Sequence, residues 1–190
     1  MKRVQLLPVG DVDVALLREL RSDISRCFHA SCDILTNTLD PAPAYHPERQ
    51  QYHSSEILQR MQSLAGPPGG RLLGVAGIDL YIPILKYIFG EAQVGGPCAL
   101  ISSYRLRQEF YGLAPDEELL LQRLTKEAVH ELGHTLGLRH CQDYRCAMAS
   151  AHAVEWIDIR ENELCEACRT QALWNCGELS RDSLRLTRPP

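Results

Sequence analysis

The feature that most constrains this chain of 190 residues is a pair of histidines with helical spacing. His130 and His134 are four residues apart, so on a helix they lie about 40° apart on one face. Two imidazoles in that arrangement can bind a single metal ion. Glu131 follows the first histidine, and from there its carboxylate can hydrogen-bond a water on the metal and take its proton. The segment therefore predicts a helix that carries two metal ligands and a general base.

A third histidine follows at a spacing that suits the same metal. Gly137 comes three residues after His134, and glycine readily takes the positive φ with which a chain often leaves a helix. The turn would bring His140 back as a third ligand. Three histidines leave the fourth position of a tetrahedral zinc open for water, which is typical of a catalytic site. A bare H-E-x-x-H also occurs by chance in helices, but the third histidine favours the metal site.

Apolar residues occupy a different face of the same helix. They step by three or four residues and form one stripe. The stripe consists of Leu121, Leu124, Ala128, Leu132 and Leu136. His130 and His134 fall on the opposite side, so we do not expect them to be ordinary core histidines. The Pro-Asp-Glu-Glu sequence at residues 115–118 predicts the start of this helix, because acidic groups suit the positive end of the helix dipole.

Behind the histidines lie a methionine and four cysteines, in the order C-x4-C-x-M followed by C-x2-C. These residues are Cys141, Cys146, Met148, Cys165 and Cys168. Together with the motif H-E-x-x-H-x-x-G-x-x-H, the series resembles the archaemetzincin family of the metzincin zinc metalloproteases. The resemblance covers residues 130–168. It implies a peptidase acting on small or unfolded peptides, and a Met-turn that places Met148 beneath the catalytic zinc. The alternative for Met148 is a simple core thioether.

The four cysteines of this series also suit a metal. In a reducing compartment their paired spacings favour zinc over disulfides. A saturated thiolate site would stabilise the C-terminal segment, which has few apolar residues, and would have no catalytic function. Free thiols and disulfides are the alternatives. We expect two zinc ions per chain, one catalytic and one structural. The remaining cysteines, which we expect to be buried thiols, are Cys27, Cys32, Cys98 and Cys176.

Composition argues against several other classes of protein. Hydrophobic residues make up 45% of the chain, as in soluble globular proteins. The formal net charge of −4 offers no basic surface for nucleic acid. No apolar run approaches the roughly 20 residues that cross a bilayer, and Pro8 and Asp11 interrupt the N-terminal stretch too early for a secretory signal. We expect a cytoplasmic monomer, without nucleic acid or membrane partners, whose substrate is a peptide or unfolded protein.

Hydrophobic patterning indicates alternating strands and helices along the chain. We expect strands at residues 4–9, 32–35, 72–80, 82–85 and 97–105. We expect helices at residues 12–27 with Asp11 as cap, at 54–64, from 115 through the histidine motif, and at 166–175. Residues 36–53 are expected to form a loop, and the acidic residues between 158 and 163 a solvated face. Leu173 and Trp174 should pack the last helix against the domain, with a mobile tail from residue 180.

This order of elements predicts an α/β fold with a mixed sheet. We expect a single catalytic domain over residues 1–190, metzincin-like, with a twisted sheet. Residues 1–137 would form the upper lobe, which includes the active-site helix, and residues 138–190 a small, irregular, zinc-stabilised lower lobe. The metzincin resemblance implies an edge strand above the cleft, to which an extended substrate adds as a further strand. The best candidate lies within residues 97–105, with an ordinary interior strand as the alternative.

The predicted function is that of a zinc-dependent metallopeptidase. The zinc on His130, His134 and His140 would polarise the peptide carbonyl, and Glu131 would act as general base on the zinc-held water. One alternative is a zinc hydrolase of non-peptide amides. Another is a zinc-stabilised peptide-binding module with a vestigial active site, which the intact Glu131 disfavours because a pure binder does not need that carboxylate.

Overall fold

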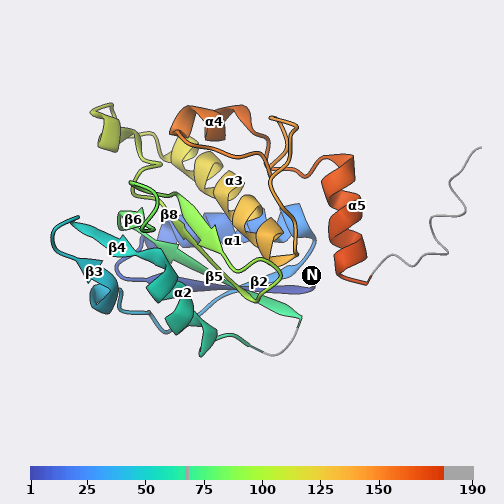
Figure 1. Ribbon diagram of the computed structural model, residues 1–190, viewed down its shortest axis with the longest axis horizontal. Coiled ribbons are helices and arrows are strands. Elements are labelled where there is room, and N and C mark those ends of the chain that lie inside the picture. Colours follow the sequence, from blue (N-terminus) through green and yellow to red (C-terminus); the bar gives the residue numbers. More distant parts are fainter. Residues whose placement is uncertain (67–68, 178–190) are drawn as a thin grey trace, which may run out of the picture.

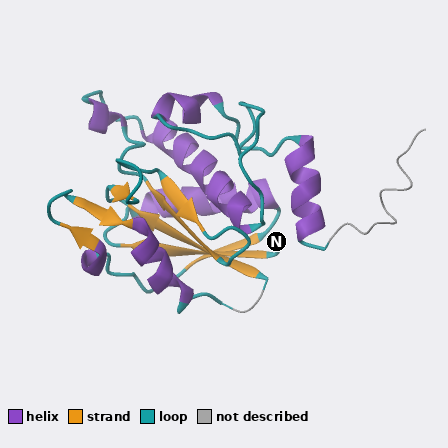
Figure 2. Cartoon of the chain, in the orientation of Figure 1, coloured by secondary structure: helices purple, strands orange, loops and turns teal. Residues whose placement is uncertain are grey.

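A computed structural model describes residues 1–66 and 69–177, which form two sheets and the helices around them (Figures 1 and 2). The larger sheet has the order β2-β1-β5-β8-β7, and all its neighbours are parallel except the pair β7 and β8. Its strands are β1 (Arg3–Val9), β2 (Ser31–Ile34), β5 (Gly70–Ala76), β7 (Gly90–Ala92) and β8 (Cys98–Ser102). The α/β fold with a mixed sheet, predicted from the patterning, is therefore confirmed.

The smaller sheet and the helices complete the molecule. The smaller sheet consists of β3 (Tyr45–His46), β4 (Gln51–His53) and β6 (Leu80–Tyr81), and it lies partly in the region expected to be a loop. The α-helices are α1 (Val14–Phe28), α2 (Ser54–Gln62), α3 (Glu117–Thr135), α4 (Val154–Ile159) and α5 (Glu166–Asn175). Two 3-10 turns are η1 (Ala42–Ala44) and η2 (Gln108–Tyr111). Of the helices within the described ranges, none combines the length and hydropathy that crossing a bilayer requires.

Helices cover both faces of the larger sheet, as Figure 1 shows, with α1 and α3 on one side and α2 on the other. In β5, Leu73 and Val75 pack with the α1 and α3 side, whereas Leu72 and Ala76 pack with α2. Strands buried on both faces have near-continuous apolar sequences, and the central strands β5 and β8 fit that rule. The layered core thus fixes α3 against the sheet on the side of β7 and β8.

The edge strand next to α3 is β7, and the expectation that it lies within residues 97–105 was wrong. That region contains β8, which is buried at all five positions and pairs with β5 on one side and β7 on the other. The interior-strand alternative therefore holds. Patterning missed β7 because three residues that begin with a glycine are too short to show a period.

The helices α3 and α5 lie close to their predicted positions. The side chain of Asp116 caps α3 by accepting a hydrogen bond of 2.9 Å from the N–H of Leu119. In α1 the cap is Asp13, whose Oδ1 accepts from the N–H of Ala15 at 2.8 Å. The expectation that Asp11 caps α1 was wrong, because the first turn begins two residues later.

Several shorter features also differ from the expectations. Residues 82–85 form a turn rather than a strand, and α4 was not expected. Asp158, Glu161 and Glu163 are exposed, as expected, although Asp158 also pairs with the buried Arg123. In α5, Ala172 is the buried residue, whereas Leu173 and Trp174 are each 37% exposed. Cys176 is exposed, and the tail from residue 180 lies outside the described residues.

Candidate metal centres

Two histidines on α3 face the loop that follows the helix. His130 is buried and His134 is half-buried, because residues 138–150 cover this face of α3. The Nδ1 of His130 hydrogen-bonds to the carbonyl of Ala147, and that of His134 to the carbonyl of Leu138, both at 2.8 Å. When Nδ1 carries the hydrogen and donates it, Nε2 keeps its lone pair for a metal. The two Nε2 atoms are 3.1 Å apart.

The third histidine reaches the same point through the turn after α3. Gly137 has a φ of +82°, the left-handed conformation that the sequence predicted there. The ring of His140 lies 5.3 Å from that of His130 and 5.1 Å from that of His134, measured between centroids. One ring nitrogen from each histidine lies within 4.8 Å of the other two. Tetrahedral zinc with Zn–N bonds of about 2.0–2.1 Å needs nitrogens about 3.3 Å apart, so this donor set fits a zinc ion.

Burial keeps these histidines in the form that binds metals. It lowers the pKa of His130 well below the ordinary value, with the guanidinium of Arg160 as the next cause. Burial also lowers the pKa of His134 and of His140. A metal ligand must be the neutral imidazole, so these histidines need not lose a proton at neutral pH before they bind zinc.

Glu131 lies beside the edge strand. Its side chain packs against Gly90 of β7, where a built Cβ would come within 2.7 Å of the Cγ of Glu131. Burial raises the pKa of Glu131 well above its usual value, and the neighbouring carboxylate of Glu127 adds to the rise. A carboxyl group with a raised pKa suits a residue that takes up and returns a proton near neutral pH.

Met148 lies directly under the histidine helix. It is fully buried, and a Cβ built on Gly133 would come within 2.3 Å of its sulfur. Its carbonyl accepts a hydrogen bond of 2.9 Å from the N–H of Cys141. The structure thus brings Met148 against the turn of α3 that separates His130 from His134.

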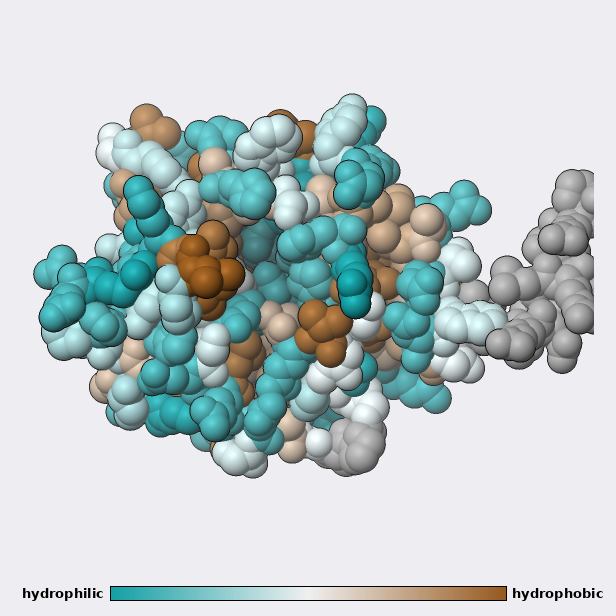
Figure 3. All heavy atoms as spheres, in the orientation of Figure 1, coloured by the Kyte–Doolittle hydropathy of each residue, from teal (hydrophilic) through white to brown (hydrophobic). Residues whose placement is uncertain are grey.

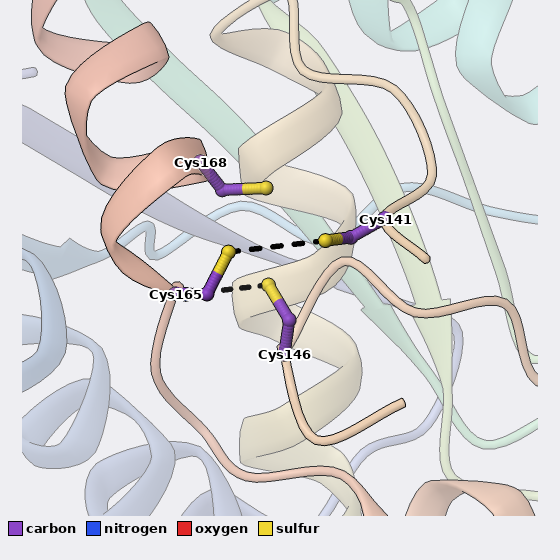
Figure 4. Close-up of side chains that lie close together, drawn as sticks. All are labelled: Cys141, Cys146, Cys165 and Cys168. Atoms are coloured by element: carbon purple, nitrogen blue, oxygen red, sulfur yellow. Dashed lines mark hydrogen bonds between the residues drawn. The ribbon is translucent and has the colours of Figure 1, made fainter. Parts of the chain in front are cut away.

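Four cysteine sulfurs converge on one point, as Figure 4 shows. Cys141 and Cys146 come from the loop after α3, and Cys165 and Cys168 from the start of α5. All four sulfurs lie within 4.8 Å of one another, and those of Cys141 and Cys165 are 3.8 Å apart. Zn–S bonds of about 2.3 Å give a tetrahedron with edges of about 3.8 Å, whereas a disulfide needs about 2.05 Å.

Backbone N–H groups around the sulfurs favour thiolates. The sulfur of Cys146 accepts from the N–H of Cys165 at 3.3 Å and from that of Met148 at 3.4 Å. The N–H of Cys168 lowers the pKa of Cys165, whereas burial raises the pKa of Cys146 and of Cys168. All eight cysteines of the chain lie among the described residues and are free thiols. This donor set also fits a zinc ion.

Three residues around these centres were missed by the sequence reasoning. Gly90 adjoins Glu131, and Arg160 lies 2.8 Å from the Nδ1 of His130. Asn175, at the end of α5, donates a hydrogen bond of 2.8 Å to the carbonyl of Leu136. Each contact joins residues 30 to 41 positions apart, so no local spacing in the sequence could have indicated it.

Comparison with known proteins finds one peptidase family and its archaemetzincin members as similar sequences. The sequence model described as peptidase family M54 matches residues 44–173. The archaemetzincin of Methanocaldococcus jannaschii is 39% identical over 166 residues, which cover 87% of this chain and 90% of the relative. The archaemetzincin of Haloarcula marismortui is 33% identical over 173 residues, covering 90% of this chain and 99% of the relative.

Two solved structures have the same fold over most of their length. One is described as a zinc-dependent peptidase from Methanocorpusculum labreanum and superposes with a TM-score of 0.81 at 28% identity, covering 89% of this chain and 99% of the other. The second is an archaemetzincin from Archaeoglobus fulgidus, with a TM-score of 0.77 at 32% identity and the same two coverages.

Proposed function

The chain belongs to peptidase family M54, and from that premise we propose that it is a zinc metallopeptidase whose catalytic zinc is held by His130, His134 and His140. The observation that carries the proposal is that one ring nitrogen of each of the three histidines points to a common centre. The Nδ1 of each ring makes a hydrogen bond that fixes the ring. Those bonds run to the carbonyls of Ala147 and Leu138, and to the hydroxyl of Ser150 at 3.1 Å. Such bonds select the tautomer and hold the ring in place.

The proposed chemistry is hydrolysis of a peptide bond. Zinc bound at the three histidines supplies a Lewis acid that polarises a carbonyl and lowers the pKa of water to about 7. Glu131 takes the proton of the attacking water as general base and returns it to the nitrogen of the departing amine. The raised pKa of Glu131 supports this double role, because the carboxyl group must be able to hold the proton between the two transfers.

We propose that the substrate binds along β7. This strand lies at the edge of the sheet, and within residues 1–66 and 69–177 its one strand partner in that sheet is β8. An extended peptide can therefore add to its outer side. Exposed apolar side chains flank β7 in the chain, with Ile84 and Leu85 before it and Val94 after it. Figure 3 shows hydrophobic patches beside a hollow on the corresponding side of the molecule. These features support small or unfolded peptides as the substrate class.

The four-cysteine site is proposed to hold a second, structural zinc, with Met148 serving as the Met-turn residue beneath the catalytic one. Thiolate ligands that fill all four positions leave no place for a substrate. Such a site needs reduced cysteines, which supports a cytoplasmic location. We further propose one catalytic domain that works as a monomer, with residues 1–137 as its upper lobe and residues 138–190 as its lower lobe, and without nucleic acid or membrane partners.

The test is a digest of a peptide library by the wild-type protein and by Glu131→Gln, each with and without a chelator. Glu131→Gln is nearly isosteric and leaves every ligand in place. We expect it to keep its metals and to lose about two to three orders of magnitude of turnover, which is the contribution of a general base. Wild-type turnover by this variant would remove Glu131 from the mechanism.

The same digest separates the alternatives. Cleavage of simple amides without cleavage of any peptide would favour a hydrolase of non-peptide amides. Binding of peptides without cleavage by the wild type would favour a binding module with a vestigial site. In both cases the metal content measured alongside shows whether the His130, His134 and His140 site was loaded during the assay.

A further inference from the structure

Arg160 is a buried cation next to the proposed zinc site. It directly follows α4, is 2% exposed, and forms an ion pair with Glu127, which is 3% exposed. Glu127 lies on α3 one turn before His130, so the pair joins α4 to the helix that carries the ligands. Taking two charges out of water is costly, and such a pair is weak evidence of a stabilising role. The other contacts of Arg160 indicate what it does there.

The guanidinium holds the loop around Met148. Its Nη1 donates to the carbonyl of Ala149 at 2.8 Å and to that of Ala147 at 3.3 Å. These two carbonyls belong to the residues on either side of Met148. The carbonyl of Ala147 is also the acceptor for the Nδ1 of His130 at 2.8 Å. Arg160 therefore fixes the group that orients the first histidine ligand.

A separate contact attaches the end of α4 to α3. Asp158 of α4 accepts two hydrogen bonds of 2.7 Å from Arg123 of α3. The carbonyl of Asp158 accepts a third, of 2.8 Å, from Lys126. These bonds attach the end of α4 to α3 without touching the histidines. A variant of Asp158 can therefore serve as a control for the attachment of α4 alone.

We propose that Arg160 is a positioning residue for the catalytic metal site. By holding the carbonyls of Ala147 and Ala149, it keeps an acceptor on the Nδ1 of His130, which leaves Nε2 as the free nitrogen that faces the metal. The Nη1 of Arg160 also lies 2.8 Å from that Nδ1. Because a guanidinium nitrogen only donates, the carbonyl of Ala147 is the acceptor for an Nδ1–H of the ring. This inference rests on the proposed zinc site and adds to it a residue outside the family motif of histidines and cysteines.

The test measures cobalt(II) affinity of the histidine site by competition with a chelator, the absorption spectrum of the bound cobalt, and the unfolding temperature. The variants are Arg160→Met, Arg160→Lys, the double variant Glu127→Met with Arg160→Met, and Asp158→Asn as control. Outer contacts to a ligand change metal affinity by about 10- to 100-fold. We expect Arg160→Met to lose that much affinity, with an altered cobalt spectrum and a lower unfolding temperature.

The double variant separates positioning from stability. Removing both charges avoids leaving Glu127 buried and unpaired, so the unfolding temperature should recover while the metal affinity stays low. Arg160→Lys keeps a donor for the carbonyls and should recover much of the affinity. Asp158→Asn should lower the unfolding temperature with wild-type cobalt affinity and spectrum. If Arg160→Met does not fold, the double variant and Arg160→Lys decide the question by the same readouts.

Two results overturn the proposal. One is recovery of affinity together with stability in the double variant, and the other is an equal loss of affinity in Asp158→Asn. Either would mean that Arg160 acts only by holding the fold together. Failure of the proposed function is distinguishable, because a wild-type protein that binds no cobalt at the histidines would remove the site itself. A peptide assay is not needed for any of these outcomes.

Discussion

At the residue scale, Gly90 is a glycine because of what lies opposite it. A Cβ built there would meet the Cγ of Glu131 at 2.7 Å, its Oε1 at 2.8 Å and the backbone oxygen of Leu100 at 2.8 Å. Real side chains do not approach so closely, and the backbone oxygen belongs to the neighbouring strand β8, which cannot move aside. The missing side chain at residue 90 thus sets the space available to Glu131, the proposed general base.

We therefore predict that Gly90→Ala slows catalysis without removing metal. The added methyl group must displace either Glu131 or β7. A misplacement of about 1 Å at an active site can cost about 100-fold in rate, so we expect kcat/KM to fall by about 10- to 100-fold. The histidine ligands are untouched, and zinc content should match the wild type. The measurement is peptide hydrolysis together with elemental analysis of the same sample.

Gly112→Ala is the matched control for that variant. Gly112 has a φ of +74° and nothing within 4 Å of a built Cβ, so alanine there strains the backbone without touching the site. It should lower stability and leave the rate per bound zinc unchanged. A normal rate in Gly90→Ala with full metal content would show that Glu131 does not depend on the space beside β7.

At the scale of elements, α5 connects the two proposed metal centres. Its N-cap Cys165 and its first turn, with Cys168, supply two of the four thiols. Its last residue, Asn175, donates to the carbonyl of Leu136 at 2.8 Å. That carbonyl immediately precedes Gly137, the turn that returns the chain to the third histidine. The helix therefore joins the four-cysteine site to the turn from both of its ends.

From this connection we predict that the cysteine site supports the catalytic one. Cys165→Ser leaves all three histidines intact but weakens the thiolate site and loosens the start of α5. His140 should then lose its fixed position, and zinc at the histidines should become about 10- to 100-fold easier to remove. The measurement is release of that zinc to a competing chelator in the wild type and the variant. Equal release, with the cysteine site proven empty, would make the two centres independent.

Cys98→Ser is a suitable comparison for this prediction. Cys98 is a buried thiol of β8 that belongs to the core under α2 and not to the four-cysteine cluster. The same replacement there costs stability by burying a hydroxyl. It should leave the release of zinc unchanged, so any effect of Cys165→Ser on zinc can be assigned to the cluster.

The elements also show what could be predicted from the sequence and why. The long periodic helix α3 was placed by local signals, namely the acidic residues at its start, its apolar stripe and the ligand spacing. The short elements β7 and α4 were missed, since three and six residues hold less than two turns or repeats of any pattern. Ligand sets within one motif were predictable, whereas Arg160 and Gly90 act through contacts between distant parts of the chain.

At the scale of the whole molecule, the segment after α3 has a small core that depends on the rest of the chain. Leu136, Leu138 and Ala172 form this cluster with Cys146 and Met148, and Met1 and Phe28 from the N-terminal region pack against it. The cluster is too small to fold alone. Its four convergent thiols could hold a metal ion, and the proposed structural zinc would contribute to holding the segment in place.

We predict that the purified protein holds two zinc ions per chain. The two ligand sets share no residue, and the sulfur and nitrogen separations of both fit tetrahedral zinc. His130→Ala removes one ligand of an open three-histidine site and should leave one zinc per chain. Cys146→Ser removes the most buried of the four thiols and should lower the content further, because the segment that carries His140 loses its support. Elemental analysis after extensive dialysis measures each value.

If the wild type holds one zinc and His130→Ala still holds it, only the cysteine site binds metal under those conditions, and the proposed catalytic centre would have to be abandoned.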